Sequence, residues 1–332
     1  MCISILVAES LVGAHARESE TAERHLQAYP PLKRDFKVTV AIPASLVSDI
    51  PHLREKTSRI GLIGRALAMF RVDEVTIFPD HPGKRQRRDA ELIAAILSYM
   101  EAPQYLRKHL FKIRRELRYV GVLPPLRTPH HPLRNRKKDL KIGEYREGVV
   151  VSERHEGILV EVGVESLILV PNVQAAAGTR VTVKIAEKDE NPSAQLADRE
   201  EVDVYWGYKV RVSKVPFGHM LKENPFDLVV ATSRRGEPLM KVADELLKAW
   251  RESRRVLIAF GSPTKGLQEI VAQEGLKLDE LADFVVNTIP NQATETVRTE
   301  EALYATLAAL NLIATSGKTL SMYHIKRHAS EP

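Results

Sequence analysis

The feature that most constrains the fold is an alternation of short apolar runs with amphipathic segments. Apolar runs occur at 227–232 (DLVVAT), 256–260 (VLIAF) and 284–287 (FVVN), and segments with apolar residues at helical spacing separate them. A similar alternation begins with KVTVAIPAS (37–45) and DEVTIF (73–78). Because parallel strands need crossover connections that are usually helices, this order predicts an α/β fold with a parallel sheet covered on both faces.

The middle of the chain follows a different rule, since apolar residues there alternate with period two. Glycines fall between the alternating runs, which predicts short strands joined by turns in a small closed β-barrel. Neither α/β part alone has enough strands for a stable sheet, so we expect the barrel to be inserted into one α/β domain. The alternative is two domains in series. The expected divisions are an N-terminal extension without regular order (1–36), the first α/β half with a basic linker (37–140), the barrel (141–220) and the second α/β half (221–325).

Composition narrows the class of protein. Hydrophobic residues make up 44% and charged residues 28% of 332, as in ordinary globular proteins. The single cysteine, Cys2, excludes a disulfide framework and a cysteine-cluster metal site, so we expect no metal. No apolar run approaches the roughly 20 residues of a membrane helix, and the first apolar stretch lacks a basic region before it. These features predict a cytoplasmic protein without a signal peptide.

Positive charge is concentrated beside the predicted barrel. The net charge is +6, and basic runs occupy 83–89, 106–118 and 126–141. Such a run is usually a solvated face, but three runs of one sign next to a barrel favour RNA or DNA as partner. The expected nucleic-acid contacts are Arg85, Arg87, Arg88, Arg114, Arg115, Arg136, Lys137, Lys209 and Arg211. The aromatic group Tyr205, Trp206 and Tyr208 is expected either to stack on bases or to fill the barrel core.

Three polar loops follow strands in the second α/β half: VVATSRRGEP, LIAFGSPTKG and NTIPNQATETVRTEE. Ligands bind at the carboxyl ends of strands in open α/β sheets. Gly236, Gly261 and Gly266 allow close backbone approach to a ligand, whereas Pro263 and Pro290 stiffen their loops. The glycine patterns for dinucleotides and for nucleotide phosphates are absent, so neither NAD nor ATP is supported.

These three loops resemble the cofactor loops of the SPOUT class of RNA methyltransferases. The likeness is closest to the archaeal and eukaryotic branch with an OB-like insertion, related to the centromere-associated SPOUT protein. In addition, KTSRIGLIGRALAMFRVDEVTIF resembles the first SPOUT motif, and Arg65 matches its arginine. The resemblance implies a C-terminal trefoil knot, an OB/S1-like barrel, a homodimer and S-adenosylmethionine as cofactor, bound in a bent shape by the loop at 287–298.

The resemblance also implies roles for particular residues. Arg65 and Arg298 would stabilise negative charge that develops on the base, and Glu295 would accept its proton. Arg65 is equally compatible with a scaffold role, in which its stem covers the edge of the core. The implied cofactor contacts, made largely through the backbone, are Thr232, Gly236, Gly261, Ser262, Pro263, Asn287, Ile289, Pro290, Gln292, Thr296 and Val297.

The sequence thus favours an S-adenosylmethionine-dependent methyltransferase that acts on a base of structured RNA, with ribosomal RNA expected. The branch suggests N3 of a uridine in large-subunit RNA. The alternative is a non-catalytic RNA-binding protein that keeps the SPOUT fold as a scaffold. A nucleotide-dependent oxidoreductase is disfavoured by the missing glycine fingerprint.

Overall fold

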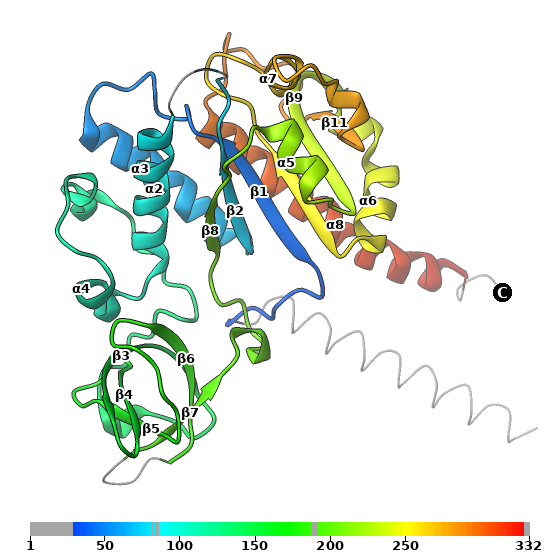
Figure 1. Cartoon of the computed structure of the whole chain (residues 1–332). Coiled ribbons are helices and arrows are strands. Elements are labelled where there is room, and N and C mark those ends of the chain that lie inside the picture. Colours follow the sequence, from blue (N-terminus) through cyan, green and yellow to red (C-terminus); the bar gives the residue numbers. More distant parts are fainter. Residues whose placement is uncertain (1–28, 82, 84–85, 188–191, 329–332) are drawn as a thin grey trace, which may run out of the picture.

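A six-stranded parallel sheet forms the larger part of the computed structural model, which describes residues 29–81, 83, 86–187 and 192–328 (Figure 1). Its strand order is β11-β9-β10-β1-β2-β8, and every neighbouring pair is parallel. The strands are β1 (Lys37–Pro43), β2 (Glu74–Phe78), β8 (Lys209–Val212), β9 (Leu228–Pro238), β10 (Arg255–Ala259) and β11 (Phe284–Asn287). The predicted parallel sheet is confirmed.

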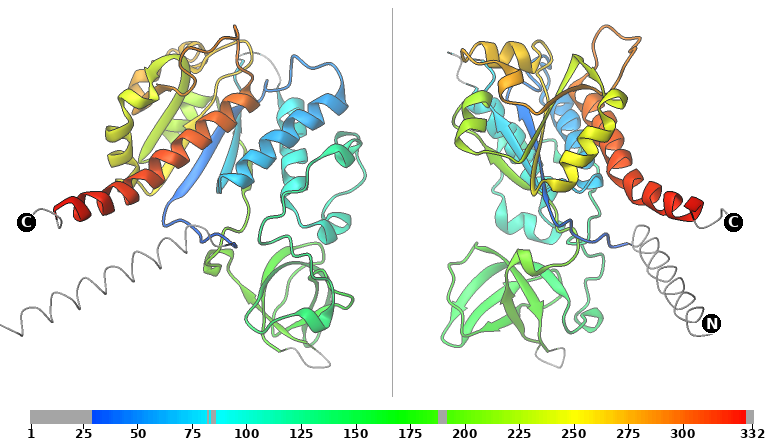
Figure 2. Two further views of the ribbon diagram at one scale, coloured as in Figure 1. Left: turned by 180° about the vertical axis from the view of Figure 1, so that it is seen from behind. Right: turned by 90° about the vertical axis from the view of Figure 1, so that its right-hand side faces the viewer.

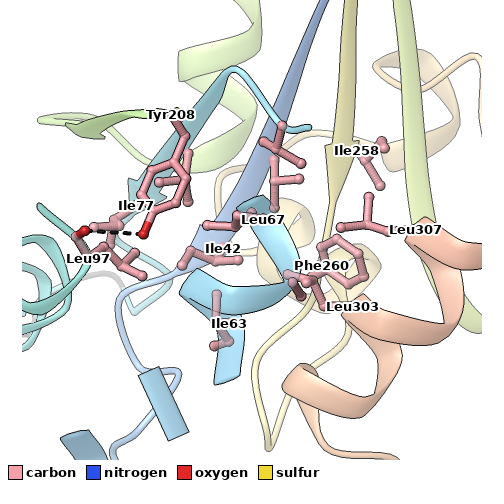
Figure 3. Close-up of a cluster of buried hydrophobic side chains, with 14 of the residues drawn as sticks. Ile42, Ile63, Leu67, Ile77, Leu97, Tyr208, Ile258, Phe260, Leu303 and Leu307 are labelled. Atoms are coloured by element: carbon pink, nitrogen blue, oxygen red, sulfur yellow. Dashed lines mark hydrogen bonds between the residues drawn. The ribbon is translucent and has the colours of Figure 1, made fainter. Parts of the chain in front are cut away.

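Helices cover this sheet on both faces, because its central strands are apolar on both. Residues Val38, Val40 and Ile42 of β1 pack against one helical layer, whereas Ala41 packs against the other. The first layer contains α2 (Leu53–Met69), α3 (Arg87–Glu101), α6 (Ala243–Glu252) and α8 (Thr299–His328), and the second contains α5 (Phe217–Glu223) and α7 (Leu267–Ala272). Figure 2 shows α8 crossing the first face, and Figure 3 shows Leu303 and Leu307 of α8 beside Phe260.

The five-stranded antiparallel sheet lies below the parallel one in Figure 1. Its order is β5-β4-β3-β6-β7, and an isolated bridge between Leu169 and Ser193 brings its two edges together. Inward-facing apolar residues such as Val150, Ile158 and Val183 fill its interior. The predicted barrel is therefore present as a nearly closed sheet, formed by β3 (Tyr145–Arg154), β4 (Gly157–Glu161), β5 (Ile168–Pro171), β6 (Arg180–Ile185) and β7 (Ala194–Ala197).

The structure corrects the predicted C-terminal limit of the barrel. The run KVRV forms β8, which pairs in parallel with β2 so that Lys209 lies opposite Glu74. Lys209 and Arg211 therefore lie on the edge of the parallel sheet and not on the barrel. The period-two alternation was correct, but alternation alone does not say which sheet a strand joins.

The aromatic group before β8 is buried between the two sheets. Tyr205, Trp206 and Tyr208 are 3%, 8% and 1% exposed, and Tyr208 donates a hydrogen bond to the Leu97 carbonyl at 3.1 Å (Figure 3). These side chains are packed against the core, and none of them presents an open ring face for base stacking.

Part of the predicted N-terminal extension is also packed. Arg34 donates hydrogen bonds to the carbonyls of Phe70 and Arg71, and Phe36 contacts the Trp250 ring edge to face at 5.9 Å. Residues 29–36 thus belong to the folded body, contrary to the expectation for 1–36. Cys2 and the rest of residues 1–28 lie outside the described residues.

Short helical turns fill the connections. Helix α4 (Arg107–Leu110) follows α3, and 3-10 helices occur at Gln104–Leu106, Arg115–Leu117, Val120–Val122, Lys137–Asp139, Arg199–Glu201, Leu239–Lys241 and Leu278–Glu280. Within the described part of the chain, no helix combines the length and the apolar character that a membrane span requires. The same residues contain no group of three or more His, Cys, Asp or Glu side chains placed to hold a metal ion.

Candidate functional site

A cavity of about 500 Å³ lies at the carboxyl ends of β9, β10 and β11. The three polar loops singled out in the sequence form its walls. Of the residues expected to contact a cofactor, most line it, and they are Thr232, Gly261, Ser262, Pro263, Asn287, Ile289, Gln292, Thr296 and Val297. Glu295, the expected proton acceptor, lines it as well.

The first wall arises because β9 breaks its pairing with β11. Consecutive residues Val285 and Val286 lie opposite Ala231 and Glu237, so residues 232–236 leave the ladder and bulge towards the cavity. Thr232 anchors the start of this bulge by donating its hydroxyl to the Ala259 carbonyl at 2.9 Å.

Gly236 does not line the cavity. A Cβ at this position would lie 2.6 Å from the Val285 carbonyl oxygen, so its place in the fold requires close backbone packing against β11. Pro290 is exposed and is also absent from the cavity wall.

The second wall is a tight turn after β10. The Ser262 N–H donates to the Lys265 carbonyl at 2.9 Å, and the Lys265 N–H donates to the Ser262 hydroxyl at 3.0 Å. A Cβ at Gly261 would meet the Lys265 carbonyl oxygen at 3.0 Å, which is tighter than ordinary van der Waals contact. The turn therefore needs glycine at 261, and the missing side chain leaves backbone accessible to a ligand.

The third wall is the long loop at 287–298, which is tied to the first. Asn287 accepts a hydrogen bond from the Ile289 N–H at 2.9 Å and donates to the Arg234 carbonyl at 2.9 Å. Arg234 in turn donates to the Glu295 carbonyl at 2.7 Å. These bonds hold the loop across the end of the sheet, with its polar side chains around the cavity.

Three basic residues on the wall were not expected as site residues. Arg234 and Arg235 lie in the β9 bulge and Lys265 in the turn after β10, and all three line the cavity with the acidic Glu269 and Glu295. Their positions were visible in the sequence, since they lie within TSRRGEP and GSPTKG, two of the loops expected to contact the cofactor. The site can therefore present positive charge as well as backbone groups to a bound ligand.

Arg65 and Arg298 lie outside this wall. Arg65, on α2, donates two hydrogen bonds through Nη1, to the carbonyls of Pro125 at 2.9 Å and of Leu126 at 2.5 Å. Arg298 is exposed at the end of the third loop, where its backbone N–H donates to Glu301 at 2.9 Å. Within one chain, Arg65 therefore holds the 123–126 segment against α2.

The expected RNA contacts are spread over several surfaces. Arg87 and Arg88 are exposed at the start of α3, Arg114 and Arg115 follow α4, and Arg136 and Lys137 lie in the linker before the barrel. Lys209 and Arg211 are exposed on β8. Arg85 lies outside the described residues. None of the described members lines the 500 Å³ cavity.

The histidine pair in the linker belongs to a buried junction between the two sheets. His130 and His131 each place Nε2 within 2.8 Å of the Glu101 carbonyl, at the end of α3. Burial, the neighbouring His130 and Arg107 lower the pKa of His131 to about 3, although Glu101 opposes this shift. His131 is therefore neutral at physiological pH, and the pair has a structural place rather than a phosphate or metal contact.

Charged side chains complete this junction. The Glu101 carboxylate contacts Arg180 of β6 at 2.6 Å and Arg199 at 3.1 Å, while Arg180 also contacts Glu147 of β3 at 2.5 Å. Burial by itself would raise the pKa of Glu101, but Arg180, His130 and Arg199 outweigh it and hold that pKa well below its usual range. The barrel is thus joined to the parallel sheet by a buried ion network.

Fold and site together define an α/β protein with a cavity formed by the polar loops at the carboxyl edge of its sheet. The family described as "Putative RNA methyltransferase" matches residues 37–310. The chain belongs to this family, which identifies it as an enzyme that methylates RNA and confirms that expectation. The match spans both sheets and all three loops of the cavity.

Named relatives agree with the family. A 28S rRNA (uridine-N(3))-methyltransferase of Drosophila melanogaster is 32% identical over 91% of this chain and 66% of its own length. The human protein of the same name is 31% identical over 83% of this chain and 78% of its own length. An uncharacterized protein of Halobacterium salinarum is 35% identical over 82% of this chain and 98% of its own length.

Proposed function

We propose that the cavity binds S-adenosylmethionine and that the enzyme transfers the methyl group to N3 of a uridine in large-subunit ribosomal RNA. The observation that carries the proposal is the convergence of the three predicted cofactor loops on one cavity of about 500 Å³. That volume lies within the range of small-molecule sites. The target follows from the named activity of the relatives from fly and human.

The donor groups of the cavity suit this cofactor. Gly261 leaves the turn backbone uncovered, which suits contact with an adenine or a ribose through main-chain groups. Arg234 and Lys265 suit the carboxylate of the methionine part, and Glu269 and Glu295 suit its ammonium group and the sulfonium. The cofactor, when bound, supplies an electrophilic methyl group.

The residues of this chain then orient the base and remove the proton from its acceptor nitrogen. Holding the acceptor nitrogen in line with the methyl group accounts for a large part of the acceleration. Glu295 borders the cavity and is exposed, so its carboxylate is available to accept the N3 proton. Arg298 follows the same loop outside the cavity wall, and its proposed role is to stabilise negative charge on the base.

We further propose a homodimer in which α2 and α8 form the interface. Leu62 and Met69 of α2 and Leu312 of α8 are 44%, 52% and 65% exposed, which is unusual for large apolar side chains. Tyr304 of α8 donates to the Leu62 carbonyl at 3.1 Å, so the two helices form one surface. Arg65 borders the same surface, and in this proposed dimer its side chain would act at the methyl-transfer site of the second copy.

The loop at 287–298 is also proposed to be the threaded part of a trefoil knot, and the barrel to be of the OB/S1 type. The knot is supported by the bonds from this loop and from Thr299 to the two preceding loops, through Asn287, Arg234 and Gly261. The barrel type is supported by its five antiparallel strands and nearly closed edges.

Calorimetry with the purified chain tests the cofactor first, with NADH and ATP as controls. We expect selective micromolar binding of S-adenosylmethionine. Methylation of ribosomal RNA, followed by nucleoside mass spectrometry, is then expected to yield N3-methyluridine. A folded protein that binds RNA but not S-adenosylmethionine would replace the enzyme by the non-catalytic scaffold, and methylation of another atom would correct the target.

A further inference from the structure

A second cavity, of about 530 Å³, lies on the open face of the parallel sheet, away from the three cofactor loops. Successive side chains of a strand point to opposite faces of the sheet, so only every second residue can line this cavity. Val38, Val75 and Val210 face the layer of α2 and α3, so Lys37, Glu74 and Lys209 face the other side. Helices α5 and α7 cover that side over β9, β10 and the carboxyl ends of β1 and β2, where Ala41 and Phe78 pack, and the cavity lies beyond them at the amino ends of β1, β2 and β8.

The cavity is basic. Its lining includes seven Lys or Arg residues and four Asp or Glu residues. Glu200 is paired with Lys33 and Lys37, and Glu74 is paired with Arg211. Of the remaining cations, Lys209, Lys214 and Arg255 form no ion pair within the described part of the chain, which leaves their positive charge free for an anionic ligand.

An aromatic platform borders these cations. The Arg255 guanidinium lies over the Phe226 ring at 5.0 Å from its centroid, and Phe226 is only partly buried. The hydroxyls of Thr39 and Thr76 form part of the floor. A basic groove with a stacking surface is the arrangement that binds single-stranded nucleic acid, where phosphates meet cations and a base lies on an aromatic or guanidinium plane.

We propose that this groove, which we call the sheet-face groove, binds a single-stranded segment of the substrate RNA, with phosphates on Lys209, Lys214 and Arg255 and a base against Phe226. A cavity of about 530 Å³ has the volume of a site for a small molecule, which is on the order of one or two nucleotides. The proposal rests on the proposed function for the identity of the RNA as substrate. It places a second RNA contact between the barrel and the sheet.

The test compares two triple variants that remove the same charge. One is K209A/K214A/R255A in the sheet-face groove. The other is K241A/K248A/R251A, just before and within helix α6, on exposed positions away from both cavities. Fluorescence anisotropy measures the dissociation constant of a labelled single strand of about 12 nucleotides and of a hairpin duplex of equal length, as a function of salt.

We expect the groove variant to bind the single strand roughly 50-fold more weakly at 0.15 M salt, with a salt slope smaller by about 2, because three phosphate contacts are lost. The α6 variant is expected to bind as the wild type does. Phe226→Leu, which keeps an apolar side chain, is expected to weaken single-strand binding by about fivefold or more. Equal losses in both triple variants, or wild-type preference for the duplex, would overturn the proposal.

Two further measurements separate this proposal from the proposed function. Each variant is titrated with S-adenosylmethionine, which must bind as tightly as it does to the wild type if folding and cofactor cavity are intact. Crosslinking of a 4-thiouridine RNA to the unmodified protein is expected to label peptides around β8. If the wild type binds no cofactor, the proposed function fails while the groove result stands. Normal methylation and normal RNA binding by the groove variant would overturn the groove proposal and leave the proposed function intact.

Discussion

The cavity at the carboxyl ends of the strands and the barrel–sheet junction are both rich in charged side chains, but these are mostly exposed at the cavity and buried in ion pairs at the junction. At the junction, Glu101 and Glu147 are 4% and 2% exposed, and their carboxylates are saturated by arginines and by the Trp206 indole. At the cavity, Arg234 and Glu295 are exposed. Saturated buried charge fixes one geometry, whereas exposed polar groups remain free to meet a ligand.

The largest expected effect concerns chemistry at the cavity. Replacing Glu295 by Gln removes the proposed proton acceptor without changing side-chain size, so we expect the methylation rate to fall by about 10²- to 10⁴-fold. Single-turnover rates between pH 6 and 9 measure this change. Glu252→Gln, at the exposed end of helix α6 and outside this cavity, is the matched control and should retain full activity. Full activity of Glu295→Gln at every pH would remove Glu295 from the mechanism.

The next effect concerns stability at the junction. Arg180→Ala leaves Glu101 and Glu147 buried without their shared cation, and the expected loss of unfolding free energy is about 3 kcal/mol. Urea denaturation measures it. Lys184→Ala, on the same strand, is exposed over the Tyr145 ring and should cost under about 1 kcal/mol. Equal losses in the two variants would show that the buried network does not differ from a surface contact.

A smaller effect tests the closeness of packing in the cofactor turn. Gly261→Val places its Cβ against the Lys265 carbonyl and fills space beside the ligand, so S-adenosylmethionine should bind at least about tenfold more weakly, or roughly 1.4 kcal/mol. Calorimetry measures the affinity. Gly121→Ala, at an exposed position outside the cavity, is the control, since no atom lies within 4 Å of a Cβ there and the affinity should hold. Wild-type affinity in Gly261→Val would place the ligand away from this turn.

A further effect, of about 2 kcal/mol between pH 7 and 5, is the pH dependence of the junction. The pKa of His131 is about 3 in the folded protein and near 6.5 when unfolded, so between these values the unfolded chain binds the extra proton. The free energy of unfolding should therefore decrease as pH falls from 6.5, by up to about 1.4 kcal/mol per pH unit.

Urea denaturation between pH 7 and 5 tests this decrease above the range in which carboxylates titrate. His131→Gln should flatten the profile, whereas His155→Gln, at an exposed turn of the barrel, should leave it unchanged. An identical slope for His131→Gln and the wild type would contradict the assignment of this effect to the junction.

The parallel sheet and the three polar loops at the ends of its strands were predictable because their signals are local. Strand runs such as DLVVAT and FVVN carry their own apolar pattern, and the polar loops follow them directly. The partner of KVRV was not predictable, since β8 pairs with β2 more than 130 residues earlier and its alternation suits either sheet. Burial of Trp206 and the carbonyl contacts of Arg65 depend on segments distant in sequence, and periodicity does not report on such contacts.

The place of β1 in the middle of the sheet has a consequence for biosynthesis. β1 leaves the ribosome early, but one of its two neighbours, β10, is made only after residues 44–254, which takes roughly 10 to 40 s at usual elongation rates. The barrel strands all fall within residues 145–197 and have every partner at hand far sooner. During translation the nascent chain therefore carries a finished barrel beside a sheet in which apolar β1 still lacks one of its two neighbours, and such transiently exposed apolar strands favour aggregation.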